Sequence, residues 1–337
     1  MGNNNVRIDI HQGDARDIET DILALKHMEN AEGVGKVVAD AIGLESHRLE
    51  NAAWIPDFRE LPDLGESKLF NRISRSSTVN AQNILYIGVQ PAPDFRYQDI
   101  RQFTRRSLVI ANRQLNAVKH VTFTLHGPGY GLDEREAFES ELAGVIDAIQ
   151  ERVAPDTLER ISFVEIDPVR ANRLETILQD FIPNGLVEKN EPRDTQTRSV
   201  GYDSESKPHV FVAMPFDEDL DDVYFLGIQD AVHSADFLCE RVDHVSFTGD
   251  ILDQIQERIE SASLVIADMT DANPNVYLEV GYAWGNDVST LLLSQDTDHL
   301  KFDVQRHNTI VYDRNDIRGL KNELSETLTD FSIPSGR

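Results

Sequence analysis

Residues 268–283 bring together side chains that glycosidic-bond chemistry requires. Asp268 ends a short, apolar, β-branched run, and the Asp, Asn and Pro residues of 270–275 favour a helix that starts near Asn275 and contains Glu279. Open α/β sheets bind ligands beyond the carboxyl ends of their strands, so Asp268, Asn275 and Glu279 are expected to converge on one crevice. One carboxylate can attack or stabilise the sugar carbon while the other orients groups or handles protons.

The residue types alone are equally compatible with a structural role for the same segment. In that interpretation Asp268 and Asn275 only cap the chain turn, and Glu279 favours the positive end of the helix. Perturbed carboxylates also arise in purely structural settings. The surrounding elements must therefore show whether these side chains reach a common site.

Alternating strands and helices are expected to position this segment. The periodicity predicts strands at 209–216, 237–242, 263–268, 289–294 and 307–312, and helices at 219–235, 249–262, 275–285 and 315–331. This alternation predicts a flavodoxin-like, doubly wound parallel sheet. Further candidates for substrate binding lie at strand ends or beside the carboxylate: Met214, Pro215, Phe216, Arg241, Asp243 and Tyr282. Ordinary packing and ion pairing remain the alternative for these residues.

Glycine turns mark the region before residue 188. Gly13-Asp14 separates two short strands, and a turn at 33–35 opens a helix. A buried strand at 121–125 runs into the glycine-rich turn 127–131, which is followed by another helix. Glycines expose backbone N–H groups, and a helix N-terminus adds positive potential, so such a turn can hold a diphosphate. A tight connection between strand and helix explains a lone glycine turn as well.

Length and charge limit the remaining classes of function. The 337 residues exceed the usual size of one domain, and the polar, Pro- and Gly-containing segment 188–207 is predicted to link a domain at 1–187 to one at 208–337. A formal charge of −27 without a basic cluster argues against nucleic-acid and anionic-membrane partners. We found no apolar run long enough to span a bilayer and no signal peptide, so a cytoplasmic location is expected.

The inventory of metal-binding side chains is small. Cys239 is the single cysteine, which excludes an internal disulfide, and it is expected to be a core residue. The ten histidines show no metal-binding spacing. The sequence therefore predicts neither a metal nor any other cofactor.

Three stretches, 210–216, 265–270 and 273–283, resemble the nucleoside 2-deoxyribosyltransferase-like family, a relative in fold of the TIR domains that cleave NAD. The resemblance implies that Glu279, in a Glu-x-Gly-x-Ala pattern, is the nucleophile and that Asp268 is the strand-end carboxylate of the site. Asn273-Pro274-Asn275 stands where the transferases usually have an acidic, Ser-rich or Gly-rich turn. This departure concerns the deoxynucleoside substrate rather than the nucleophile.

The first half resembles macro domains, which bind ADP-ribose. Gly13-Asp14 matches the family's adenine-contacting pair, while the turns 33–35 and 127–131 match its two phosphate loops. The resemblance implies a signal-binding site formed by Asp14, Gly33, Gly35, Gly127, Gly129, Tyr130 and Gly131. Leu25-Lys26-His27-Met28 replaces the Asn-rich stretch of the family's hydrolases, so we expect binding without ADP-ribose hydrolysis.

Together the two resemblances predict an N-glycosidase effector that a nucleotide signal activates, of the kind found in bacterial antiviral defence. The first domain is expected to bind an ADP-ribose-type ligand, and the second to cleave NAD or another nucleotide. Glu279 would attack C1′, Asp268 would orient the sugar hydroxyls or the nucleophile, and Asn275 would hold the sugar or the base. The family also implies a homo-oligomer. The alternatives are a non-catalytic nucleotide sensor and a nucleoside deoxyribosyltransferase.

Overall fold

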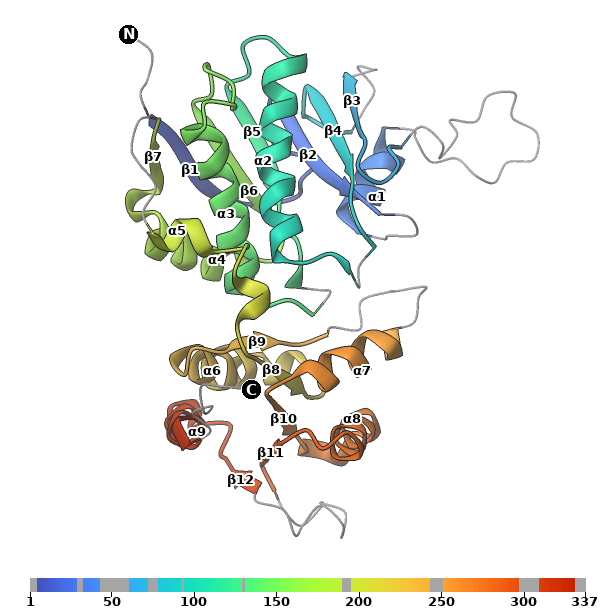
Figure 1. The fold of residues 1–337 in the computed structure, drawn as a ribbon, viewed down its shortest axis with the longest axis vertical. Coiled ribbons are helices and arrows are strands. Elements are labelled where there is room, and N and C mark those ends of the chain that lie inside the picture. Colours follow the sequence, from blue (N-terminus) through green and yellow to red (C-terminus); the bar gives the residue numbers. More distant parts are fainter. Residues whose placement is uncertain are drawn as a thin grey trace, which may run out of the picture. The chain divides into compact units, whose positions relative to one another are not determined.

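The computed structural model describes residues 5–28, 33–42, 61–71, 78–91, 94–128, 131–189, 195–242, 251–296 and 309–330. The chain folds into two compact units, each with its own sheet (Figure 1). The N-terminal unit comprises residues 1–127 and 134–205, and the C-terminal unit comprises 128–133 and 206–337. Within the described residues, no helix is long and apolar enough to cross a membrane.

The sheet of the N-terminal unit has seven strands in the part of the chain that the structure describes. They are β1 (Asn5–Gln12), β2 (Ile22–His27), β3 (Ser67–Asn71), β4 (Asn83–Gly88), β5 (His120–Thr124), β6 (Arg160–Glu165) and β7 (Leu186–Glu188). The strand order is β3-β4-β2-β5-β6-β1-β7. The five inner strands are parallel, and only β3 and β7 pair antiparallel at the two edges. The carboxyl ends of β1, β2 and β5 therefore meet at one edge of the sheet.

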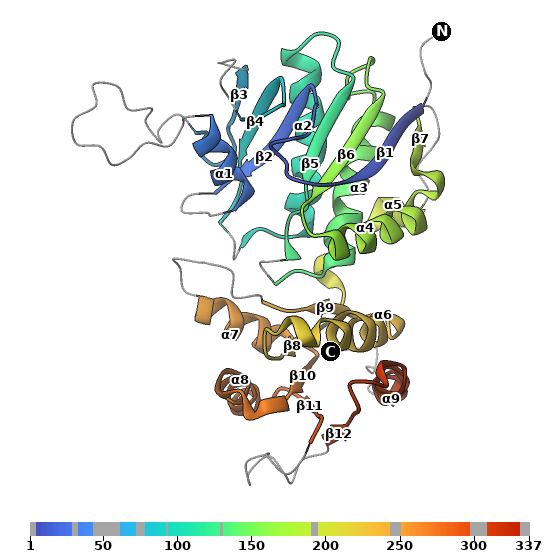
Figure 2. The same ribbon diagram turned by 180° about the vertical axis from the view of Figure 1, so that it is seen from behind.

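Helices cover both faces of this sheet. Its helical segments are α1 (Val34–Ala41), α2 (Tyr97–Gln114), α3 (Glu134–Gln150), α4 (Pro168–Phe181), α5 (Thr195–Ser199) and the short turns Pro183–Gly185 and Ser204–Ser206. Side chains of α2, α3 and α4 form one core with the sheet, and α1 packs in a second core on the opposite face (Figures 1 and 2). Burying both faces accounts for the apolar runs in the inner strands.

The predicted linker is largely part of the N-terminal unit. The guanidinium of Arg101, which is fully buried, pairs with Asp147 at 2.8 Å and donates to the carbonyl oxygens of Arg198 and Val200. The Ser204 hydroxyl also accepts from the backbone N–H of Gly201 at 2.8 Å. These bonds fold the polar segment 195–205 onto α2 and α3, so the domain boundary lies at 205/206. The polar composition of this segment predicted a linker. The sequence alone does not show that its carbonyl oxygens accept hydrogen bonds from Arg101 on α2, far away in the chain.

The sheet of the C-terminal unit confirms the predicted fold class. It contains β8 (His209–Ala213), β9 (Leu238–Glu240), β10 (Leu264–Asp268), β11 (Thr290–Ser294) and β12 (Thr309–Val311). All pairs are parallel, and the order is β12-β11-β10-β8-β9. Counted within the unit, this is the flavodoxin-like order 2-1-3-4-5, so the switch point lies between β8 and β10.

Two separate cores lie on the two faces of this smaller sheet. The unit's helical segments are Glu218–Leu220, the π-helical Val223–Gln229, α6 (Asp230–Ser234), α7 (Ile251–Ser261), Thr270–Ala272, α8 (Pro274–Gly285) and α9 (Ile317–Asp330). Side chains from α7 and α8 pack on one face, while those from 223–229, α6 and α9 pack on the other (Figure 1). Cys239 belongs to the second of these cores, as expected.

Candidate functional site

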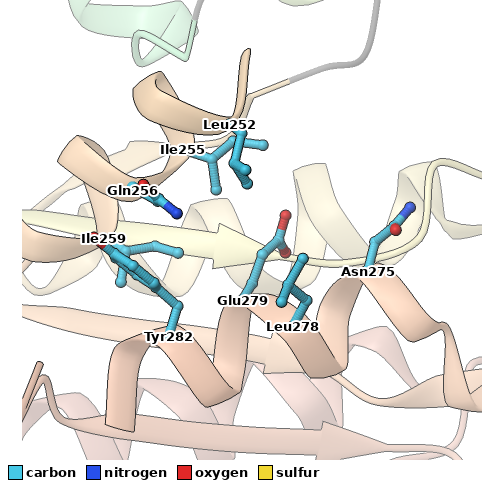
Figure 3. A pocket seen from close by; sticks show the side chains of 8 residues that line it. All are labelled: Leu252, Ile255, Gln256, Ile259, Asn275, Leu278, Glu279 and Tyr282. Atoms are coloured by element: carbon cyan, nitrogen blue, oxygen red, sulfur yellow. The ribbon is translucent and has the colours of Figure 1, made fainter. Parts of the chain in front are cut away.

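A pocket of about 340 Å³ lies between α7 and α8 (Figure 3). Each helix contributes residues at positions i, i+3, i+4 and i+7, which lie on one face of a helix. The lining residues are Leu252, Ile255, Gln256 and Ile259 from α7, and Asn275, Leu278, Glu279 and Tyr282 from α8. Glu279, Asn275 and Tyr282 were predicted to take part in the site, and the structure brings these three together.

Local sequence fixes where α8 begins. The side chain of Asn273 accepts a hydrogen bond from the backbone N–H of Asn275 at 2.9 Å, and Pro274 occupies the first helical position. The helix thus starts one residue before the predicted position. In the preceding turn, Asp271 and Ala272 have left-handed φ angles of 60° and 51°. Such backbone is costly for non-glycine residues and is concentrated at functional sites.

Glu279 is the ionisable group of the pocket. Burial raises the pKa of its carboxyl group to about 7. Among the described residues that line the pocket, none is cationic. Within the described part of the chain, the carboxylate has neither a hydrogen bond nor an ion pair. A half-buried carboxylate without an intramolecular partner is available to a ligand and can act as a nucleophile or charge stabiliser.

Asp268 does not line this pocket, contrary to the predicted convergence of two carboxylates. Successive side chains of a strand point to opposite faces, and Asp268 shares its face with Ile266, away from α7 and α8. Its carboxylate is fully buried and accepts bonds from the Tyr312 hydroxyl at 2.6 Å and the Thr270 N–H at 2.9 Å. Burial raises its pKa. The sequence thus predicts that the strand ends at Asp268, but it does not specify on which face of the sheet the Asp268 side chain lies.

Other predicted substrate residues lie on the same face as Asp268. The guanidinium of Arg241 stacks over the Tyr224 ring at 3.8 Å, approaches Phe216 at 5.4 Å, and lies 3.5 Å from the Met214 sulfur. Met214 belongs to the core beneath α6 and α9, and Pro215 connects it to Phe216. None of these residues lines the pocket beside Glu279. Asp243 lies outside the described residues.

Sequence reasoning missed the contribution of α7. Gln256 and three aliphatic residues form the wall opposite Glu279. The spacing Leu252, Ile255, Ile259 was visible as an amphipathic stripe, which ordinarily indicates core packing. The single polar residue within that stripe, Gln256, was the available signal.

Four of the predicted signal-binding residues, Asp14, Gly33, Gly35 and Gly127, lie at the carboxyl edge of the N-terminal sheet. Asp14 follows β1, and Arg16 pairs with its carboxylate at 2.6 Å and lowers its pKa through hydrogen bonds. Gly33, with φ of 106°, precedes α1, and Gly35 lies in its first turn. Gly127 follows β5, the neighbour of β2. The loops after β2 and β5 are therefore adjacent, while β1 lies three strand spacings from β2, roughly 14 Å away.

The second glycine turn is divided between the units. Gly127 belongs to the N-terminal unit, but Gly131 belongs to the C-terminal one. Gly131 has φ of 87°, and a Cβ there would lie 2.9 Å from a methyl group of Val242. Close packing within the C-terminal unit thus explains this glycine without a ligand. Gly129 and Tyr130 lie outside the described residues.

A buried polar cluster supports the start of that turn. Oε1 of Glu141 on α3 accepts a bond from the backbone N–H of His126 at 2.9 Å and shares a second hydrogen bond with its Nδ1 at 2.6 Å. Burial holds the pKa of Glu141 well above and that of His126 well below the usual range. Burial also lowers the pKa of Lys26 to about 7, while the nearby charge of Glu141 opposes this effect. Among the described residues, no group of His, Cys, Asp and Glu side chains is arranged to hold a metal ion.

No protein-family model and no curated protein matches the chain. Solved macrodomains are similar to about half of it. A Trypanosoma brucei macrodomain in complex with ADP has 16% identity and a TM-score of 0.41, with 51% of this chain and 69% of that chain covered. The same macrodomain with ADP-ribose gives 18% identity, a TM-score of 0.40 and the same coverage. The macro domain of ganglioside induced differentiation associated protein 2 gives 16% identity and 0.40, with 53% and 85% covered.

Proposed function

We propose that the C-terminal unit is an N-glycosidase that cleaves the bond between base and ribose in NAD or a related nucleotide. The observation that carries the proposal is the half-buried carboxylate of Glu279, which faces a pocket large enough for a nucleoside whose described lining residues include no cation. In this proposal Asn275, at the same pocket, holds the sugar or the base. The resemblance of 273–283 to the nucleoside 2-deoxyribosyltransferase-like family supports the same assignment.

The reaction proceeds in two steps with a covalent intermediate. An oxygen of Glu279 forms a bond to C1′ as the C1′–N bond breaks, and the base leaves with the bonding electron pair. A nicotinamide leaves as a neutral molecule because its ring nitrogen loses its positive charge. Water then attacks C1′, releases its proton to solvent and regenerates the carboxylate. Asp268 has no direct part in these steps; it fixes the turn before α8 through Thr270.

The N-terminal unit is proposed to bind an ADP-ribose-type ligand at the carboxyl edge of its sheet. The adjacent loops at Gly33 and Gly127 supply backbone N–H groups for a diphosphate, and Asp14 follows β1 at the same edge of the sheet, where it contacts the base. The family resemblances further support three parts of the proposal. These are control of cleavage by this ligand, a homo-oligomeric state and a role in antiviral defence.

Base release tests the proposal. The purified full-length protein is incubated with NAD, ATP, AMP, IMP or deoxynucleosides, each with and without ADP-ribose, and free bases are measured by chromatography. The expected result is release of a base from at least one nucleotide, with ADP-ribose binding detected by calorimetry. Exchange of bases between deoxynucleosides without ADP-ribose would instead identify a deoxyribosyltransferase.

A non-catalytic sensor is the second candidate. The position of Asp268 on the other face of the sheet favours it, because Glu279 is then the one carboxylate among the described lining residues. This candidate predicts that nucleotides bind to the C-terminal unit and that no base appears under any condition.

A further inference from the structure

We infer that Gln256 determines which bases the proposed glycosidase accepts, by hydrogen bonding to the edge of the base with its side-chain amide. The inference rests on the proposed function, and it names the class of base that the pocket between α7 and α8 takes. This class is an uncharged base edge that carries a donor next to an acceptor, as in a carboxamide.

The first step is the division of the pocket into three tiers. Because α7 and α8 each follow one parallel strand and lead into the next, both helices begin at the carboxyl edge of the sheet and run in the same direction. The lining residues span seven positions on each helix, or about 10 Å. The outer tier holds Leu252 and Asn275, the middle tier Ile255, Gln256, Leu278 and Glu279, and the inner tier Ile259 and Tyr282.

The second step is the orientation of the substrate. Glu279 must face C1′, so the ribose lies in the middle tier, with the base on one side and the phosphates on the other. The outer tier lies toward the helix N-termini, whose potential is positive, and the inner tier contains no cation among the described residues. The phosphates therefore lie outward and the base inward. Ile259 and the Tyr282 ring supply the apolar and aromatic surfaces that a flat base requires.

The third step identifies the polar group that recognises the base. Gln256 and Glu279 face the same space from opposite helices (Figure 3). Within the described part of the chain, no hydrogen bond engages the Gln256 amide. The Tyr282 hydroxyl, by contrast, donates to Glu260, and Asn275 lies in the outer tier. Gln256 is thus the lining residue left to pair with an inward base.

Charge determines which bases this arrangement rejects. The amide of Gln256 offers one donor group and one acceptor, which match a carboxamide in both senses. A carboxylate on the base would lie near Glu279, and the part of the pocket lining that the structure describes offers no cation to balance it. Like charges in a partly buried site repel strongly, so a nicotinic acid is rejected where a nicotinamide is accepted.

The test compares two substrates in three proteins. Base release is measured for NAD and for nicotinic acid adenine dinucleotide, with ADP-ribose present, in the wild type, Gln256→Leu and Gln254→Leu. Gln254 lies on the same helix, two residues away and outside the pocket lining, so it is the matched control. We expect Gln256→Leu to reduce kcat/KM for NAD by about 10- to 100-fold, mainly through KM. Gln254→Leu should match the wild type.

Further measurements separate recognition from folding and from failure of the proposed function. Gln256→Asn keeps the amide on a shorter side chain and should recover part of the loss, while circular dichroism confirms that each variant is folded. Wild-type cleavage of NAD with unchanged kcat/KM in folded Gln256→Leu would overturn the inference alone. Equal cleavage of both dinucleotides by the wild type would also overturn it. Failure of the wild type to cleave NAD would overturn the assigned base class, and absence of base release from every nucleotide would overturn the proposed function as well.

Discussion

Two glutamates with raised pKa values, one in each unit, show how differently the same side chain can be used. Glu141 is fully buried and makes two hydrogen bonds with His126, with the charge of Lys26 nearby. Glu279 is half-buried, faces a pocket, and within the described residues has no such partner. The Glu141 carboxyl group therefore has a structural role in the N-terminal unit. The second retains its capacity to interact with a ligand, which is the property expected of a catalytic group.

The comparison predicts that removing the two carboxylates changes stability in opposite directions. Glu141→Ala should destabilise the N-terminal unit by about 3–5 kcal/mol, because it leaves the buried backbone N–H of His126 without its acceptor and opens a cavity. Hydrogen exchange of peptides from α3, combined with thermal unfolding, measures this loss. The exposed pair of Glu151 with Arg105 gives the control, and Glu151→Ala should cost at most about 1 kcal/mol. Equal losses in both variants would contradict the structural role of Glu141.

Glu279→Gln should stabilise the C-terminal unit above neutral pH. The folded-state pKa of about 7 exceeds the ordinary value of 4.5, so the wild type loses stability as pH rises from 4.5 through 7. The glutamine variant has no such loss, and its advantage should grow over that range to about 1–3 kcal/mol at pH 8. Urea unfolding at pH 5 and pH 8 measures the difference. Glu326→Gln, on exposed α9 surface, should show no pH-dependent advantage. A pH-independent difference for Glu279→Gln would show that the carboxylate is not desolvated.

Asp268→Asn should have the smallest effect of the three on stability and little effect on chemistry. The variant keeps the shape of the side chain and removes a buried charge, but it weakens the bonds to Tyr312 and Thr270, so the net change in stability should stay within about 1 kcal/mol. Base release should stay within about tenfold of wild type, because Asp268 does not line the pocket. A loss comparable to that of Glu279→Gln would restore Asp268 to the catalytic site and contradict the division between the two faces of the sheet.

The sequence predicted elements and topology well because their signals are local. The strand and helix periods of the C-terminal unit gave the flavodoxin-like order, and the Asn and Pro residues before α8 gave its start within one residue. The face on which Asp268 lies depends on the parity of the strand register, which the strand end alone does not specify. Segment 195–205 was predicted to be part of a linker but packs on the N-terminal unit, because its hydrogen-bond partner, Arg101, lies almost one hundred residues earlier.

The missed wall of the pocket has a similar cause. Leu252, Ile255 and Ile259 form a stripe that also serves ordinary packing, and only the juxtaposition with α8 turns it into a pocket. Gln256 is a candidate for ligand binding because it lines the same pocket as Glu279 on the facing helix. Pairings between helices are set by tertiary structure and leave no spacing pattern in one chain.

Base release by Glu279→Gln tests the central claim most directly. The account predicts that the wild type releases base from NAD or a related nucleotide, at a rate that rises with pH through about 7 as the carboxylate ionises. Glu279→Gln should lower that rate by at least about 10³-fold while ADP-ribose binding to the N-terminal unit is unchanged. Glu326→Gln should retain full activity. Base release that persists in folded Glu279→Gln would contradict the account.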